Sequence, residues 1–258
     1  MPKPLALITN DDGIDSWFLR VLVEAMVENF EVVVAAPMGE QSWIGRAMSR
    51  RREVHLAEYN NFPCQAFALD GTPGDCANIA LGHLLERKPD VVCSGINLGY
   101  NACLPLILSS GTVGGAMEGA FWGIPAVAFS HVIPQVEFEK IRENHGQVEG
   151  DFAESLRHAA KFATKFAESI LGTKHSTPVV HNINFPKRTY ADTEVTRTEP
   201  APLEGQSLFV RETAASFKFG KVERDPAPHG GIDDMQALND GKISHTILDI
   251  GEMGKVRG

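Results

Sequence analysis

A pair of aspartates shortly after the first apolar segment constrains the fold more than any other feature of this chain. Residues 5–8 are all apolar, and Asp11, Asp12 and Gly13 follow them closely. A short run of this kind predicts a buried parallel strand. Neighbouring side chains of a strand point to opposite faces, so two adjacent aspartates converge only where the strand ends in a turn, and a glycine permits such a turn. The sequence therefore predicts two carboxylates at the carboxyl end of a strand, where open α/β sheets bind ligands.

The proximity of Asp11 to Asp12 also predicts what the pair binds. Two clustered carboxylates repel each other unless a proton or a cation joins them. Their oxygen atoms suit Mg²⁺, Mn²⁺ or Ca²⁺. Adjacent aspartates before a glycine are usually only a turn, but the predicted location favours a hard divalent cation.

The composition describes an ordinary soluble globular protein. Its 258 residues allow one large core, and contents of 43% hydrophobic and 22% charged residues are typical of such proteins. The net charge of −9 argues against a surface for sequence-independent nucleic-acid binding. A small anionic substrate stays compatible with this charge, because a local site can oppose the overall sign.

The cysteines and the N-terminal segment predict a cytoplasmic protein. The cysteines form no close pair and no spacing typical of a metal site, so we expect buried, reduced thiols; they are Cys64, Cys76, Cys93 and Cys103. No basic segment precedes the first apolar run, so a signal peptide is not expected. Residues 91–117 carry no charge, but their asparagines, glycines and proline predict a strand, a loop and a helix inside a globule rather than a membrane span.

Apolar strands alternate with helical patterns through the first two thirds of the chain. The predicted strands cover residues 5–9, 31–36, 53–58, 65–69, 90–94, 125–129 and 179–185, and the predicted helices cover 17–29, 72–87, 113–120 and 151–171. This alternation predicts an α/β fold with a doubly wound, mostly parallel sheet. Residues 190–248 show no convincing long helix, and we expect β-hairpins and an extended arm that serves oligomer contacts. We therefore divide one domain into a core, residues 1–186, and a C-terminal extension, residues 187–258.

Three polar loops are expected at the carboxyl ends of predicted strands. They hold Asp11 with Asp12, Ser42, and the segment from Asn97 to Asn101. In a doubly wound sheet these strand ends share one edge, so the loops can meet there. Ser42 and Asn97 would add neutral oxygens to the two carboxylates and leave positions for water and a substrate oxygen. Taken singly, these residues are more often ordinary loop residues that bond to their own backbone.

A helix start completes this set of candidate residues. Ser110, Gly111 and Thr112 directly precede the predicted helix of small residues at 113–120. Exposed N–H groups at a helix start bind phosphate without a charged side chain, although the same residues can serve only as a cap. No lysine or arginine lies between Asp90 and Glu118, so the cation and the helix dipole would have to offset phosphate charge. The combination predicts metal-assisted hydrolysis of a phosphate ester.

Other catalytic templates are absent from the sequence. The first turn lacks the G-x-G-x-x-G pattern of a usual dinucleotide site. The chain contains no P-loop, no G-x-S-x-G nucleophile elbow and no spaced histidine and cysteine set for zinc.

An ordered series of motifs runs along the chain. They are Ile-Thr-Asn-Asp-Asp-Gly at 8–13, Ala-Pro at 36–37 with Gln-Ser at 41–42, Gly-Thr-Pro at 71–73, Ser-Gly-Ile-Asn at 94–97, Ser-Gly-Thr-Val at 110–113, Met-Glu-Gly at 117–119, Asn-Ile-Asn-Phe-Pro at 182–186 and Asp-Asp at 233–234. In this order they resemble the SurE family of survival-protein phosphatases, which are metal-dependent 5′/3′-nucleotidases. The resemblance is dense through residue 129 and sparser afterwards.

The resemblance implies a Rossmann-like domain with exchanged C-terminal elements, assembled as a homodimer or homotetramer. It implies hydrolysis of nucleoside 5′-monophosphates, or alternatively of 3′-monophosphates, with one Mn²⁺ or Mg²⁺ per subunit. By motif, the metal ligands would be Asp11, Asp12, Ser42 and Asn97, and the phosphate contacts would be Asn10, Asn101, Ser110, Gly111 and Thr112. Of these, we expect Asp11, Asp12, Asn101 and Ser110 to be catalytic.

Three departures from the family pattern affect the expected pocket. Trp43 replaces a small residue next to Ser42, residues 102–109 are apolar instead of acidic, and Ser109 stands where a tyrosine is common. The metal set is intact, so an enzyme is the leading interpretation. Two alternatives stay open: a non-enzymatic sensor of nucleotide or phosphate, and a phosphatase for a phosphate ester other than a nucleotide.

Overall fold

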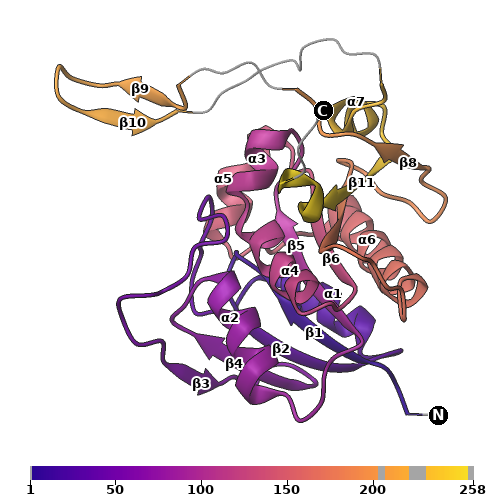
Figure 1. Cartoon of the computed structure of the whole chain (residues 1–258). Helices are drawn as coiled ribbons and strands as arrows, with labels where there is room; N and C mark the ends of the chain where they lie inside the picture. Colours follow the sequence, from indigo (N-terminus) through magenta and orange to yellow (C-terminus); the bar gives the residue numbers. More distant parts are fainter. Residues whose placement is uncertain (1, 203–206, 221–230, 255–258) are drawn as a thin grey trace.

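The computed structural model describes residues 2–202, 207–220 and 231–254, and its centre is a nine-stranded sheet (Figure 1). The strand order is β3-β4-β2-β1-β5-β6-β7-β11-β8. The strands are β1 Leu5–Thr9, β2 Glu31–Pro37, β3 Leu56–Glu58, β4 Gln65–Leu69, β5 Val91–Leu98, β6 Ala126–His131, β7 Val179–Phe185, β8 Val195–Thr198 and β11 Ile243–Asp249.

Most of the sheet is parallel. Strands β4, β2, β1, β5, β6 and β7 pair in parallel, whereas β3 and β11 run antiparallel to β4 and β7. The chain first winds outward from β1 to β2 and β4, and then returns to β5 on the other side of β1. This reversal is the topological switch point at which open α/β sheets bind ligands. The predicted doubly wound, Rossmann-like α/β class is confirmed.

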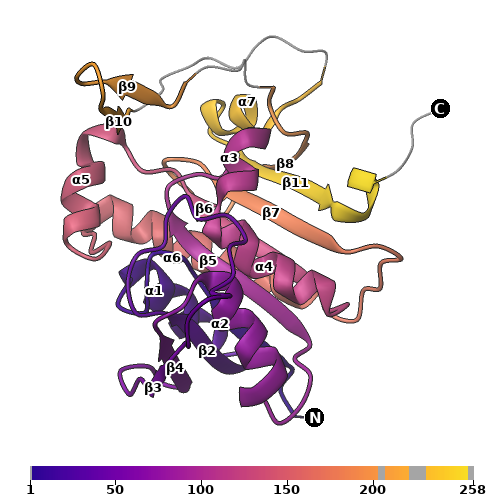
Figure 2. The same ribbon diagram turned by 60° about the vertical axis from the view of Figure 1, so that its left-hand side comes forward.

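Helices cover both faces of the sheet, as Figures 1 and 2 show. Helix α1 (Trp17–Met26) packs with α6 (Gly150–Ser169) over one face, and α2 (Pro73–Ile79) packs with α4 (Gly111–Phe121) over the other. The buried stripe of α1 includes Phe18, which is inaccessible to solvent. Burial of such apolar stripes is the main source of stability for helices on a sheet.

Small residues let α4 lie unusually close to the sheet. A β-carbon at Gly115 would lie 2.8 Å from Thr9 Cγ2, and one at Gly119 would lie 2.5 Å from Val92 Cβ. Both separations are shorter than carbon–carbon van der Waals contact. Glycine at these two positions therefore sets the height of the helix above β1 and β5, and with it the position of the helix start.

Several boundaries differ from the predictions. The predicted helix 72–87 ends early, because α2 passes into a π-helical turn, Ala80–Leu84. The strand predicted at 90–94 continues to Leu98, with a register shift between Ser94 and Asn97. The first two residues of the polar loop predicted from Asn97 to Asn101 therefore lie in the strand instead.

Three helices were not predicted: α3 (Leu104–Ser109), α5 (Gln135–Glu143) and the short α7 (Asp234–Asn239). Among the described side chains of α5 only Ile141 is buried, so that helix has no apolar period for a sequence to reveal. The charge-free segment 91–117 forms β5, α3 and most of α4. In the described ranges, no helix has both the length and the apolar character needed to cross a membrane.

The C-terminal extension is only partly separate from the core. A predicted hairpin is confirmed: β9 (Phe209–Arg211) pairs antiparallel with β10 (Phe217–Phe219) and projects from the body (Figure 1). Strands β8 and β11 instead join the main sheet. Residues 203–206, 221–230 and 255–258 of the expected arm lie outside the described residues. The division at residue 186 stays a prediction.

The stability of this fold is expected to fall in acid because of His131 at the end of β6. The ring is fully buried, with Nδ1 3.0 Å from Val132 O and Nε2 3.1 Å from Ser155 Oγ. Burial lowers the pKa of His131 to about 4, below the usual histidine value of 6.5. Between pH 4 and pH 6.5 the His131 imidazole is protonated in the unfolded chain but not in the folded chain. The free energy of unfolding therefore falls as the pH falls from 6.5 toward 4.

We expect His131 alone to lower the free energy of unfolding by about 2 kcal/mol at pH 5 relative to pH 7.5. Urea unfolding of wild type and His131→Gln at the two pH values measures the difference, because glutamine keeps both hydrogen-bonding functions without titrating. His55→Gln, at an exposed position, is the matched control. Equal losses in wild type and His131→Gln would contradict the assignment.

Candidate active site

The ends of β1, β2 and β5 meet at the switch point. The Gln41 N–H donates to the main-chain oxygen of Asp11 at 2.7 Å, which joins the loop after β2 to the end of β1. The Leu98 N–H donates to Asp12 Oδ2 at 2.8 Å, which joins the end of β5 to the same place. The three polar loops therefore lie together, as the order of parallel strands requires.

The two aspartates lie in a poorly solvated position. Asp11 is buried, and its Oδ1 accepts a 2.6 Å hydrogen bond from Thr112 Oγ1. Burial raises the pKa of Asp11 to about 6, although the Thr112 hydrogen bond opposes this rise. The pKa of Asp12 is raised well above its usual value, first by burial and then by the charge of Asp11. A pair of carboxylates that resists double ionisation is a strong acceptor for a proton or a cation.

The two neutral candidates, Ser42 and Asn97, each adjoin in sequence a residue whose N–H bonds to the pair, Gln41 and Leu98 respectively. Ser42 is exposed, and its Oγ donates to Glu40 Oε1 at 2.8 Å. Asn97 is nearly buried, and its Nδ2 donates to the Gly99 carbonyl at 3.0 Å. The Asn97 amide nitrogen is therefore occupied, and its amide oxygen is the atom suited to bind a cation.

The start of α4 abuts Asp11. A β-carbon at Gly111 would lie 2.8 Å from Asp11 Cβ and 3.1 Å from the Gln41 carbonyl oxygen. Thr112 in the same turn holds Asp11 through its hydroxyl. Ser110 is the N-cap, and its Oγ accepts from the Val113 N–H at 3.1 Å. The Ser110 hydroxyl therefore caps the helix, and the early N–H groups of α4 lie beside the acidic pair.

Asn101 is held by a dense network. Its Nδ2 donates to Ser130 Oγ at 2.9 Å and to Thr112 Oγ1 at 3.3 Å, and its main-chain N–H donates to Asn184 Oδ1 at 2.7 Å. Its main-chain oxygen accepts from Asn182 and Asn184. These contacts fix Asn101 against the first turn of α4, next to the expected phosphate position.

Asn10 has an unsatisfied acceptor. Its Nδ2 donates to the Gly13 carbonyl at 2.8 Å, but its buried Oδ1 has no hydrogen-bond partner among the described residues. A buried polar atom without a partner carries a desolvation cost that a bound group can relieve. Asn10 therefore has one atom available for a ligand.

The chemistry of these donors fits a hard cation. No cluster of three or more histidine, cysteine, aspartate or glutamate side chains able to hold a metal exists within residues 2–202, 207–220 and 231–254. A cation at Asp11 and Asp12 must therefore complete its coordination with neutral oxygens, such as those of Ser42 and Asn97. Carboxylate, hydroxyl and amide oxygens suit Mg²⁺ or Mn²⁺ and exclude a typical structural zinc site.

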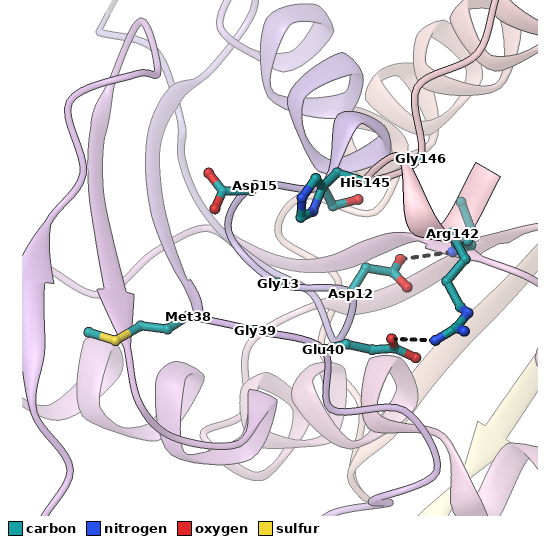
Figure 3. A pocket seen from close by; sticks show the side chains of 11 residues that line it. Asp12, Gly13, Asp15, Met38, Gly39, Glu40, Arg142, His145 and Gly146 are labelled. Carbon is teal, nitrogen blue, oxygen red and sulfur yellow. Dashed lines mark hydrogen bonds and ion pairs between the residues drawn. The ribbon is translucent and has the colours of Figure 1, made fainter. Parts of the chain in front are cut away.

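A cavity of about 170 Å³ opens beside Asp12 (Figure 3). The Glu40 carboxylate extends toward Arg142, whereas Asp15 points away. Glu40 Oε2 lies 3.4 Å from Arg142 Nη1. Sequence reasoning missed Glu40 and Arg142. The closeness of Glu40 to Ser42 was the only signal for the first, and Arg142 lies on the unpredicted helix α5.

The residues near the site that differ from the family pattern make local contacts of their own. Trp43 has a positive φ of 61° and remains 49% exposed. Its ring contacts Phe219 of β10 with centroids 4.7 Å apart. Residues 104–109 form α3, in which Ser109 Oγ donates to the Pro105 carbonyl. With these residues in place, Asp11 still contacts the start of α4.

The chain is similar to known proteins in sequence. A family model described as Survival protein SurE matches residues 6–204. A protein named 5′-nucleotidase SurE from Cytophaga hutchinsonii is 38% identical over 188 residues, which cover 72% of this chain but only 66%, just under two thirds, of that relative. Another of that name, from Methanothrix thermoacetophila, is 31% identical over 97% of this chain and 94% of its own length.

A solved structure agrees with these sequence relatives. The crystal structure of Sure protein from Aquifex aeolicus matches with a TM-score of 0.70 and 27% identity, covering 95% of this chain and 93% of that chain. The resemblance inferred from the motifs is confirmed by the family model and by the relatives. This chain belongs to the SurE family.

Proposed function

We propose that this chain is a metal-dependent phosphomonoesterase that hydrolyses nucleoside 5′-monophosphates, or alternatively 3′-monophosphates, to nucleoside and phosphate. The carrying observation is the contact between Asp11, the first residue of the acidic pair, and the first turn of α4, at the switch point of the sheet. The name 5′-nucleotidase of the relatives supports the choice of substrate.

The proposed metal ligands are Asp11, Asp12, Ser42 and Asn97, which would hold one Mn²⁺ or Mg²⁺ per subunit. A cation held by these residues would polarise a phosphoryl oxygen and lower the pKa of an attacking water. Thr112 keeps Asp11 oriented through its 2.6 Å hydrogen bond. The Leu98 N–H does the same for Asp12.

The phosphate would bind at the start of α4. The N–H groups of Gly111 and Thr112 and the helix dipole offer positive potential without a cationic side chain. Asn101 holds this turn in place through Thr112, and Ser110 caps it. Asn10 lies beneath this position, where its Nδ2 holds the turn at Gly13 and its buried Oδ1 has no partner among the described residues.

The test is a phosphate-release assay with a substrate panel. We expect AMP and other nucleoside monophosphates to be hydrolysed with Mn²⁺ or Mg²⁺, and excess EDTA to abolish the reaction. Full turnover in EDTA would contradict the metal role. Tight AMP binding without phosphate release under every metal and pH would support a sensor, and faster hydrolysis of ribose 5-phosphate than of any nucleotide would support a different phosphatase.

We further propose a homodimer or homotetramer in the cytoplasm. The hairpin β9–β10 supports the oligomer because Phe209, Val210 and Phe217 are each more than half exposed. Exposed apolar groups of this kind mark interaction surfaces. Light scattering at several protein concentrations measures the mass of the particle, and a monomer at every concentration would contradict the proposal.

A further inference from the structure

Four side chains form a series of polar contacts beside the cavity at Asp12 (Figure 3). Ser42 Oγ donates to Glu40 Oε1 at 2.8 Å, and Arg142 Nη1 donates to Glu40 Oε2 at 3.4 Å. The Nε and Nη2 groups of Arg142 donate to Glu139 Oε2 at 3.1 and 2.9 Å. Each oxygen of Glu40 therefore has its own partner, and the guanidinium is engaged on both sides.

The hydroxyl of Ser42 needs such a partner if it is to bind a cation. A serine hydroxyl has one hydrogen and two lone pairs. Coordination uses a lone pair, so the hydrogen must point away from the cation toward an acceptor. Groups that orient metal ligands from behind in this way commonly determine metal affinity. Glu40 Oε1 accepts this hydrogen in the structure.

The charge of Glu40 also reaches the acidic pair. Glu40 lines the same cavity as Asp12, at the edge of the sheet where the two aspartates lie. Glu40 thus lies close enough to strengthen the negative potential that attracts a cation. Arg142 offsets part of this charge and holds the carboxylate toward the cavity.

We propose that Glu40 and Arg142 are positioning residues of the metal site, an inference that rests on the proposed function. Glu40 accepts the Ser42 hydrogen and so directs a Ser42 lone pair toward the cation. Arg142, from α5, holds Glu40 in that orientation.

Titration calorimetry of the full chain with MnCl₂, in the absence of substrate, tests the proposal. Glu40→Ala removes the acceptor and should weaken Mn²⁺ binding by about 10- to 100-fold. Glu40→Gln keeps an amide oxygen for the Ser42 hydrogen, so it should weaken Mn²⁺ binding distinctly less than Glu40→Ala does. Arg142→Ala should weaken binding by about two- to fivefold, because the exposed ion pair contributes modestly.

A double-mutant cycle separates positioning from general electrostatics. In a Ser42→Ala background there is no hydroxyl to orient, so the added Glu40→Ala change should alter the Mn²⁺ affinity by less than about twofold. The matched control is the exposed pair of Glu154 and Arg157 on α6, which lie 2.7 Å apart with the same three-residue spacing as Glu139 and Arg142. Alanine at Glu154 or Arg157 should leave the affinity unchanged.

The possible results separate a failure of this inference from a failure of the proposed function. If wild type binds Mn²⁺ and Glu40→Ala binds it equally well, the positioning role is wrong and the proposed function stands. Equal losses in Glu40→Gln and Glu40→Ala would replace the hydrogen bond by a pure charge effect and overturn the inference. An Arg142→Ala variant with unchanged Mn²⁺ affinity but a raised KM for AMP would make Arg142 a substrate contact instead. A wild type that binds no Mn²⁺ would overturn the proposed function itself.

Discussion

Asp12→Asn is expected to reduce metal-dependent phosphate release by about a thousandfold, the loss of several kcal/mol of electrophilic stabilisation. Asparagine has nearly the same shape and keeps a side-chain oxygen for the Leu98 N–H, so the fold is preserved. Removing one of two adjacent carboxylates also relieves repulsion, so the metal-free variant should be at least as stable as wild type.

Thermal unfolding with and without Mn²⁺ checks this prediction alongside the activity assay. A ligand that binds only the folded state stabilises it by about 2.7 kcal/mol at a hundred times its Kd. Wild type should gain this stability with Mn²⁺, and Asp12→Asn should not. Asp192→Asn changes an exposed carboxylate and should behave as wild type does. An Asp12→Asn enzyme with full activity would remove Asp12 from the metal site.

Gly111→Ala should have the second-largest effect. The new methyl group would lie 2.8 Å from Asp11 Cβ, 3.0 Å from Asp11 Oδ2 and 3.1 Å from the Gln41 carbonyl oxygen. Overpacking of this kind costs about 1–3 kcal/mol, and a displacement of about 1 Å in a catalytic group lowers the rate about 100-fold. We therefore expect kcat/KM for AMP to fall by about 100-fold, with a smaller loss of stability.

Gly82→Ala is the matched control for this substitution. Gly82 is exposed, and a β-carbon there would meet only Trp122 Cη2, at an ordinary 3.9 Å. Its activity and urea midpoint should stay within error of wild type. If Gly111→Ala retains wild-type kcat/KM, the start of α4 does not need its close contact with Asp11.

The sequence predicted the parallel core well because each central strand is apolar throughout. All residues of β1 and β7 are buried, which gives a strong signal over a short segment. The capping box of Thr72 and Asp75 also marked the start of α2 correctly. Helix α5 gave no such signal, because its stability comes from few buried contacts and its charges face solvent.

The site residues were predictable where the local sequence determines their position. They were not predictable where a contact between distant segments determines it. Asp11 and Asp12 follow a strand, and Gly111 begins a helix, so their chemistry is visible locally. The pairing of Glu40 with Arg142 joins segments 102 positions apart. Nothing in either segment alone predicts that contact, since it depends on where α5 packs.

The insertion of β11 between β7 and β8 has a consequence for how the molecule is assembled. β11 pairs with β7 from Ser244 to Asp249, after a long excursion through residues 186–242. Until this late segment arrives, a fully buried strand has an open hydrogen-bonding edge, which is prone to intermolecular association. A chain ending at residue 186 would keep every proposed metal ligand and still be an aggregation-prone fragment. The core therefore depends on the C-terminal extension for its solubility.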